Sequence, residues 1–129
     1  IQVNQEISAI ASGKLCKPKV VGDSECEELK IKKETLREVK KGMLMACQEG
    51  GTGYPFFNFK PQVACKTGTA QTSKIDKTHA WFSAFAPIEA DDYTSQVVIT
   101  VMVEEGGEGS KVAAPLALEI LEFYLDDGN

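Results

Sequence analysis

The sequence predicts an α+β domain in which an antiparallel sheet is sandwiched between helices. Three segments, at residues 62–71, 78–87 and 95–104, are rich in the apolar and β-branched residues typical of strands. The linkers between them are too short to contain a crossover helix, so neighbouring strands are expected to run antiparallel. Helical periodicity is found both before and after this block. We therefore expect the order helix, helix, three strands, helix.

The first helix is expected to begin with the chain itself. Val3, Ile7, Ile10 and Ala11 recur at helical spacing, and Gly13 is placed to act as the C-cap residue. No N-cap residue precedes this helix and the sequence does not begin with Met, so we interpret the chain as part of a longer protein. The absence of a signal peptide then says nothing about the compartment.

A second helix is expected after a connecting segment. The connection contains one proline and one glycine, and it is predicted to include a short extended piece at Lys19–Val21. Thr35 and Glu38 have the spacing of a capping box at the helix start, and the glycines at 50–51 stop the helix. Its apolar stripe, which we interpret as core, consists of Leu36, Val39, Met43 and Cys47.

The loop at residues 50–61 is unusually rich in aromatic side chains. It contains Tyr54, Phe56, Phe57 and Phe59, which are four of the nine Phe and Tyr residues of the chain. Loops usually avoid such apolar density because they run over the surface. Two interpretations stay open: a flap packed onto the core, or an aromatic rim beside a ligand groove.

The last two strands and the last helix are expected to form a buried block. Both strands are apolar at both parities, as in strands that are covered on two faces. The helix lies within residues 111–129 and has Pro115 in its first turn. Its inward face is predicted to consist of Ala117, Ile120, Leu121 and Tyr124. Such a sheet needs more cover than these helices supply, so a further layer and further strands are expected from another part of the protein.

Composition excludes several classes of protein. The chain has 129 residues and a net charge of −5, without the basic balance of nucleic-acid-binding proteins. No apolar run reaches the roughly 18 residues that span a bilayer.

The four cysteines and the one histidine match no zinc-site spacing. Residues 65–67 resemble the end of a nucleotide-binding loop but lack its glycines. Neither a metal nor a cofactor is predicted.

The state of the cysteines is left open by the sequence. Free buried thiols are the simpler interpretation for Cys16, Cys26, Cys47 and Cys65. In an extracytoplasmic protein disulfides are the alternative. Cys16 with Cys26 is the first pair to consider.

The lone histidine and the linker aspartates are interpreted as structural. His79 is expected to pack beside Trp81 behind a cleft, in preference to a role as an acid or base. Asp76, Asp91 and Asp92 lie in linkers and are interpreted as solvated turn residues.

The first strand has an unusual centre, Lys66-Thr67-Gly68-Thr69. Side chains alternate along a strand, so Thr67 and Thr69 share one face and Lys66 lies on the other with Gly68. The two hydroxyls can both donate to one anion, such as a carboxylate lying along the strand. Gly68 permits close approach of a ligand, and the N–H of Thr69 can provide half of an oxyanion hole. Lys66 can influence proton transfer at a neighbouring hydroxyl or supply positive charge.

This strand resembles the third signature, K-T-G or K-S-G, of the penicillin-binding proteins and serine β-lactamases. The resemblance continues in the same order along almost the whole chain, and it points to the class B transpeptidases. The matching segments are ISAIASGKLCKPK at 7–19, GTGY at 51–54, KTGTAQ at 66–71, HAWF at 79–82, FAP at 85–87 and VAAPLALEIL at 112–121. The three-letter signature alone is a weak signal, whereas the ordered set is specific.

The resemblance implies a fold of about five antiparallel strands between helices, of which this chain supplies the last three strands and the final helix. Residues 1–129 are then the C-terminal part of one transpeptidase domain. The family's S-x-x-K and S-x-N motifs lie upstream of Ile1, and no S-x-x-K occurs in this chain. The implied partner is therefore the N-terminal part of the same domain, which carries the nucleophilic serine.

The implied activity is that of a serine D,D-transpeptidase, which cross-links peptidoglycan stem peptides through an acyl-enzyme and binds β-lactam antibiotics covalently. By the same resemblance, Thr67, Gly68, Thr69 and Ala70 bind the substrate. The N–H of Thr69 contributes to the oxyanion hole, and Lys66 assists proton transfer to the leaving group. No cofactor is implied. The implied location is the extracytoplasmic face of the bacterial cell membrane, with an anchoring helix upstream of this chain.

One residue departs from the family pattern. Glycine usually precedes the lysine in the family, and this chain has Cys65. The Cys65 side chain is expected to share the face of Thr67 and Thr69 and to narrow the cleft. We interpret it as a packed thiol and not a reactive one. The drug profile is therefore left open.

Two other functions stay open at this point. One is a β-lactamase or β-lactam sensor on the same fold, because the K-T-G-T strand is common to these activities. The other is a catalytically inactive transpeptidase-like scaffold, because the nucleophile would lie outside this chain. The aromatic loop and the HAWF strand favour the transpeptidase.

Overall fold

The computed structural model describes residues 1–88 and 95–126, so Asp91 and Asp92 lie outside the described residues. The elements follow the expected order, with a small hairpin added near the start. They are α1 (Gln2–Ser12), β1 (Lys14–Cys16), β2 (Cys26–Glu28), α2 (Lys33–Ala46), the 3₁₀ turn η1 (Tyr54–Phe56), β3 (Ala64–Gln71), β4 (Thr78–Ala86), β5 (Val97–Val103), the π-helical turn η3 (Gly109–Ala113) and α3 (Ala114–Asp126).

The larger sheet consists of the three predicted strands, in the order β3-β4-β5. Both pairs are antiparallel, as the short linkers indicate. The strands are somewhat shorter at their ends than predicted. β3 begins at Ala64, β4 ends at Ala86 and β5 covers Val97–Val103.

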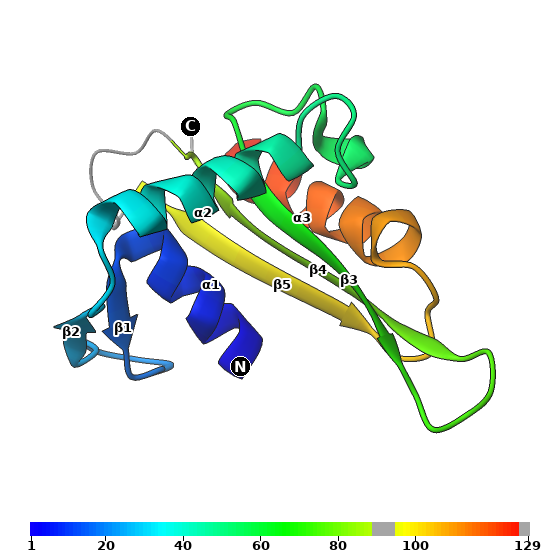
Figure 1. Cartoon of the computed structure of the whole chain (residues 1–129), viewed down its shortest axis with the longest axis horizontal. Helices are drawn as coiled ribbons and strands as arrows, with labels where there is room; N and C mark the ends of the chain where they lie inside the picture. Colours follow the sequence, from blue (N-terminus) through cyan, green and yellow to red (C-terminus); the bar gives the residue numbers. More distant parts are fainter. Residues whose placement is uncertain (89–94, 127–129) are drawn as a thin grey trace.

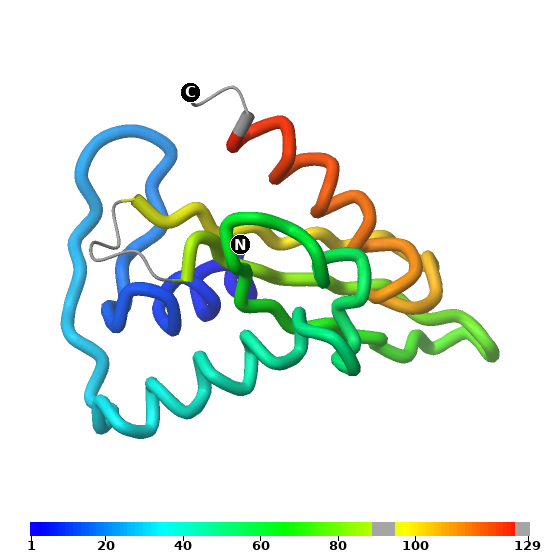
Figure 2. Tube along the Cα trace, turned by 90° about the horizontal axis from the view of Figure 1, so that it is seen from above, coloured from blue at the N-terminus to red at the C-terminus, as the bar shows by residue number. Residues whose placement is uncertain are grey.

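The sheet lies between two helical layers. Figures 1 and 2 show α3 on one face and α1 with α2 on the other. Because directly paired residues share a face, the register places Phe82 and its partner Val101 on the α3 side. Phe85 lies on the opposite side, in a second core cluster with Ile7 of α1. The apolar character of β4 at both parities therefore reflects burial on both faces.

The start of the chain confirms one prediction and corrects another. Gly13 caps α1 with φ 77°, and its N–H donates to the carbonyl of Ala9 at 2.8 Å. The expected extended piece at Lys19–Val21 is wrong, because the chain bends at residues 20–22. Residues 14–16 pair instead with residues 26–28, since these segments can satisfy each other's backbone groups.

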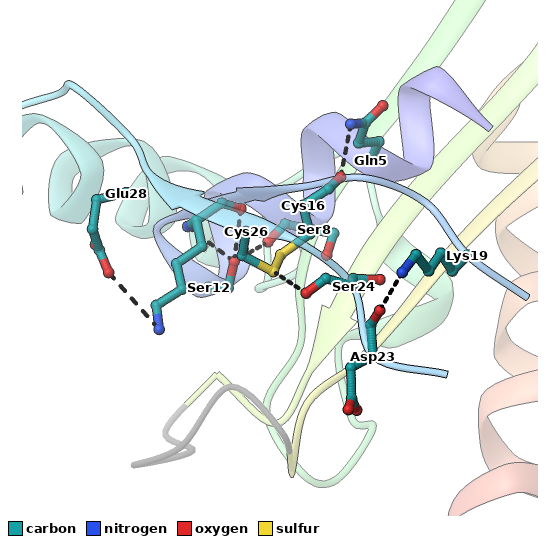
Figure 3. The surroundings of a disulfide bond; sticks show 10 residues. Gln5, Ser8, Ser12, Cys16, Lys19, Asp23, Ser24, Cys26 and Glu28 are labelled. Atoms are coloured by element: carbon teal, nitrogen blue, oxygen red, sulfur yellow. Dashed lines mark hydrogen bonds and ion pairs between the residues drawn. A yellow bond between two sulfur atoms is a disulfide. The ribbon is translucent and has the colours of Figure 1, made fainter. Parts of the chain in front are cut away.

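All four cysteines form disulfides, so the expectation of free thiols is wrong. Cys16–Cys26 closes the β1–β2 hairpin, with Cα atoms 4.0 Å apart (Figure 3). In the same region the side-chain amide of Gln5 donates to the carbonyl of Cys16 at 2.8 Å, which ties α1 to the hairpin (Figure 3). The second disulfide joins Cys47 to Cys65.

The start of α2 is earlier than predicted. Lys32 is the N-cap residue and makes no side-chain capping bond. The predicted capping box at Thr35 and Glu38 is therefore wrong, because both residues lie inside the helix. α2 ends at Ala46, ahead of the glycines at 50–51.

Lysine 40 joins α2 to the end of α1. The Lys40 Nζ donates to the carbonyl of Ala11 at 2.6 Å, which satisfies an otherwise unpaired group in the last turn of α1. The same amino group lies 6.0 Å from the ring centroid of Phe85. Burial lowers the pKa of Lys40 below its ordinary value.

The inward face of α3 was predicted only in part. Pro115 lies in the first turn as expected, and Ala117 and Leu121 are buried. Ile120 and Tyr124 are 52% and 60% exposed, so their assignment to the inward face is wrong. The helix contacts the sheet mainly through small alanine side chains. The row of buried residues on α3 is therefore narrower than the apolar pattern of its sequence suggests.

Replacing Gly42 by alanine is expected to stabilise the protein by roughly 1 kcal/mol. Gly42 lies inside α2, and a Cβ atom added there meets no heavy atom within 4 Å. Alanine therefore gains helix propensity without a clash. Denaturant unfolding of the two proteins measures the change. A loss of stability would contradict the open surroundings of Gly42.

Candidate active-site strand

Burial falls steeply along β3. Ala64 and Cys65 are fully buried, whereas Lys66, Thr69 and Ala70 are exposed. Within the part of the chain that the structure describes, β3 pairs only with β4 and is therefore an edge of the sheet. The K-T-G-T residues lie on the accessible half of this edge strand.

The register separates the K-T-G-T side chains onto two faces. Thr67 is paired with Phe82, and the pairs of this parity face α3. Gly68 is paired with Trp81 and lies on the opposite face with Lys66. The alternation that the sequence predicts is therefore present. The amino group of Lys66 donates to the backbone carbonyl of Thr67.

A residue that sequence reasoning missed lies beside Thr67. The hydroxyl of Thr67 donates to the hydroxyl of Thr52, with an Oγ1–Oγ1 distance of 2.9 Å. Thr52 belongs to the GTGY segment between α2 and η1. Thr52 is not among the predicted site residues, because the spacing of residues along the chain gives no sign that it contacts the K-T-G-T strand.

Gly109 is a second residue that sequence reasoning missed. A Cβ atom at this position would lie 2.1 Å from the carbonyl oxygen of Trp81 and 2.5 Å from that of Gly68. The first residue of η3 therefore packs directly on the backbone of two strands, at the level of the K-T-G-T glycine. The glycines at positions 106, 107 and 109 are the signal in the sequence that could have pointed to this contact.

Cys65 does not project toward a cleft. It is fully buried and bonded to Cys47, with Cα atoms 5.8 Å apart. The expectations of a packed thiol and of a side chain that narrows the cleft are both wrong. Position 65 shares the parity of Thr67 and Thr69, as expected, but Cys47 and Gly53 of the segment that follows α2 cover its side chain.

The aromatic loop is largely part of the core. Phe56 is 2% exposed and stacks on Phe82 with ring centroids 5.0 Å apart. Phe59 meets Phe56 edge to face at 5.5 Å. These two residues support the flap interpretation. Tyr54 is half exposed and Phe57 is only partly buried, so these two residues do not belong to the core.

Three other polar residues, His79, Asp76 and Lys111, lie outside the K-T-G-T segment. The ring Nδ1 of His79 accepts the backbone N–H of Glu105 at 3.0 Å, which links β4 to the segment after β5. Asp76 is exposed in the β3–β4 turn with φ 60°, as its interpretation as a turn residue requires. Next to η3, Glu108 raises the pKa of Lys111 through a hydrogen bond and its charge.

Neither a metal centre nor a membrane span emerges from residues 1–88 and 95–126. No group of three His, Cys, Asp or Glu side chains in these residues is arranged to hold a metal ion. None of the helices described there combines the length and apolarity needed to cross a bilayer.

Comparison with known proteins identifies relatives of this chain. It is 34% identical over 103 residues to the peptidoglycan D,D-transpeptidase MrdA of Haemophilus influenzae. This match covers 67% of the chain and 15% of that protein, so the chain spans only a small part of its relative's length.

Two solved structures share its fold. Pseudomonas aeruginosa PBP2, in complex with WCK 5153, superposes with a TM-score of 0.76 at 27% identity, covering 97% of this chain and 29% of that one. The PBP2 of Helicobacter pylori, in complex with MreC, gives a TM-score of 0.68 at 30% identity, covering 89% of this chain and 23% of that one. They confirm the α+β transpeptidase-like fold.

A family model completes the comparison. The model of the penicillin binding protein transpeptidase domain matches residues 1–122. The match includes the buried core of the sheet, the K-T-G-T strand and most of the last helix. The chain belongs to the penicillin-binding protein transpeptidase domain family.

Proposed function

We propose that this chain is the K-T-G-T-bearing part of a serine D,D-transpeptidase that cross-links peptidoglycan stem peptides. The observation that carries the proposal is the placement of Lys66–Thr69 on the exposed half of an edge strand. Membership of the family and the name of the MrdA relative support it. Residues 1–129 then form the C-terminal part of one domain, which also includes a part bearing S-x-x-K and S-x-N.

On this proposal the substrate lies along the open edge of β3. The hydroxyls of Thr67 and Thr69 donate to its carboxylate, and Gly68 and Ala70 leave room for its backbone. A serine from the other part of the domain attacks the scissile carbonyl and forms an acyl-enzyme. The backbone N–H of Thr69 donates to the developing oxyanion. Lys66 assists proton transfer to the leaving group.

A β-lactam would react with the same serine because it presents a carboxylate and a strained amide in the same arrangement. The two disulfides of this chain support an extracytoplasmic location, since disulfides persist in oxidising compartments. We place the enzyme at the outer face of the bacterial cell membrane, attached by a helix upstream of this chain.

The proposal is tested by acylation of the full-length protein. After incubation with benzylpenicillin, intact mass is expected to increase by one drug mass, and peptide mapping is expected to place the adduct on the S-x-x-K serine. With a chromogenic cephalosporin we expect one stoichiometric event. Steady hydrolysis would instead indicate a β-lactamase, and a folded protein that is never acylated would indicate a scaffold.

A further inference from the structure

The segment that follows α2 is attached to β3 at the start of the K-T-G-T residues. Cys47 is bonded to Cys65, the residue directly before Lys66. Five residues after Cys47, Thr52 accepts the hydroxyl hydrogen bond of Thr67 at 2.9 Å. On either side of these two attachments, the N–H of Gly53 donates to the carbonyl of Ala46 at 2.7 Å and closes the loop at its base. We call residues 46–53, with their bonds to Cys65 and Thr67, the clamp.

The position of Thr52 is set by close packing on the disulfide. A Cβ atom on Gly53 would lie 2.6 Å from the sulfur of Cys65 and 2.8 Å from that of Cys47. A Cβ atom on Gly51 would lie 2.3 Å from the carbonyl oxygen of Ala46. Glycine on both sides of Thr52 therefore lets the loop rest directly on the sulfur pair and the end of α2. The height of the Thr52 hydroxyl above β3 follows from that contact.

The hydroxyl pair has a chemical consequence for ligand binding. Each threonine hydroxyl has one hydrogen to donate and can accept from others. In the free protein the hydrogen of Thr67 is donated to Thr52. When a carboxylate binds, Thr67 can turn its hydrogen to the ligand while Thr52 donates to Thr67. Only hydroxyl hydrogens rotate, and such a chain of hydrogen bonds strengthens the final donor.

We infer that Thr52 and the Cys47–Cys65 disulfide are positioning residues for carboxylate recognition by the K-T-G-T strand. Thr52 orients the hydroxyl of Thr67, and the disulfide holds the loop that carries Thr52 at the height of this hydroxyl. The inference rests on the proposed function in one respect, namely that the ligand presents a carboxylate to Thr67. The attachment of the clamp to the edge strand β3 follows from the observed contacts and does not depend on the proposed function.

The role of Thr52 is tested in the full-length protein with Thr52→Val and Thr52→Ser. Acylation by benzylpenicillin is expected to become about tenfold less efficient in the valine variant and to recover in the serine variant. The loss is expected in the drug concentration that gives half-maximal rate, with the limiting rate unchanged. With the methyl ester of the same penicillin, which lacks the anion, valine is expected to have no effect. Equal losses for acid and ester would overturn the role of Thr52 in carboxylate recognition.

The role of the disulfide is tested with the double variant Cys47→Ala and Cys65→Ala. Its matched control is the double variant Cys16→Ala and Cys26→Ala, which removes the other disulfide, in a hairpin that does not pair with β3. We expect faster hydrogen exchange at the amides of residues 66–69 and weaker acylation in the first variant only. Unchanged exchange and acylation in a folded Cys47/Cys65 variant would overturn this role.

Failure of this inference can be told apart from failure of the proposed function. If the wild-type protein is not acylated, the proposed function fails, and hydrogen exchange at residues 66–69 still decides whether the clamp holds the strand. If the wild type is acylated and the Cys47/Cys65 variant does not fold, the Thr52 variants decide the inference, because they leave both disulfides in place.

Discussion

Replacing Lys66 by methionine is expected to slow acylation of the full-length protein by benzylpenicillin about a hundredfold or more. The amino group of Lys66 is the cation that the proposed mechanism uses for proton transfer, and methionine keeps the length of the side chain without the charge. The free energy of unfolding is expected to change by less than about 0.5 kcal/mol. Lys66 is exposed and bonds only the adjacent carbonyl of Thr67 among the described residues.

The matched control for this experiment is Lys77→Met. Lys77 is also exposed and lies in the turn between β3 and β4, away from the K-T-G-T residues. The Lys77→Met substitution removes the same unit of charge, so a general electrostatic effect on the encounter with the drug would appear in both variants. Acylation of the Lys66 variant at the wild-type rate would remove Lys66 from the mechanism, even if the protein is a transpeptidase.

Replacing Gly109 by alanine is expected to destabilise the protein by roughly 3 kcal/mol, the upper end of the usual cost of overpacking. The added Cβ atom would meet the backbone oxygens of Trp81 and Gly68 at 2.1 and 2.5 Å. These are main-chain atoms inside a paired sheet, so they cannot turn away as the end of a flexible side chain would. Denaturant unfolding measures the loss.

The same substitution is expected to disturb the candidate site. Relief of the clash must move either η3 or the paired strands at Gly68 and Trp81. Acylation is then expected to fall by more than the fraction of protein that is unfolded. Gly42→Ala is the control, because it adds the same methyl group where no atom lies within 4 Å. Equal stability of the two alanine variants would contradict the close packing of η3 on the strands.

Much of the fold could be predicted because it depends on local patterns. The period of two along β3 places Thr67 and Thr69 on one face whatever surrounds the strand. Short linkers require antiparallel neighbours, and Gly13 is the residue type best suited to a left-handed helix cap. The K-T-G-T motif is contiguous, so its residues were candidates before any tertiary contact was known.

The errors arose where a pattern has more than one solution in three dimensions. Ile120 and Leu121 are both apolar and adjacent, and only the narrow contact of α3 with the sheet decides that Leu121 is buried. The capping-box spacing of Thr35 and Glu38 occurs inside a helix as readily as at its start. The extended piece predicted at Lys19–Val21 does not form. A strand needs a partner for its backbone groups, and residues 14–16 pair with residues 26–28 instead.

The sequence by itself determined the three antiparallel strands, the helices before and after them and the family to which the K-T-G-T strand belongs. Only the tertiary structure decided that Cys65 is bonded to Cys47, that Thr52 meets Thr67 and that Gly109 packs on Gly68. Periodicity and motifs are properties of neighbouring residues along the chain. These three contacts join segments that are distant in sequence, and they form because burial of the sheet on both faces brings the ends of α2 and η3 onto one edge strand.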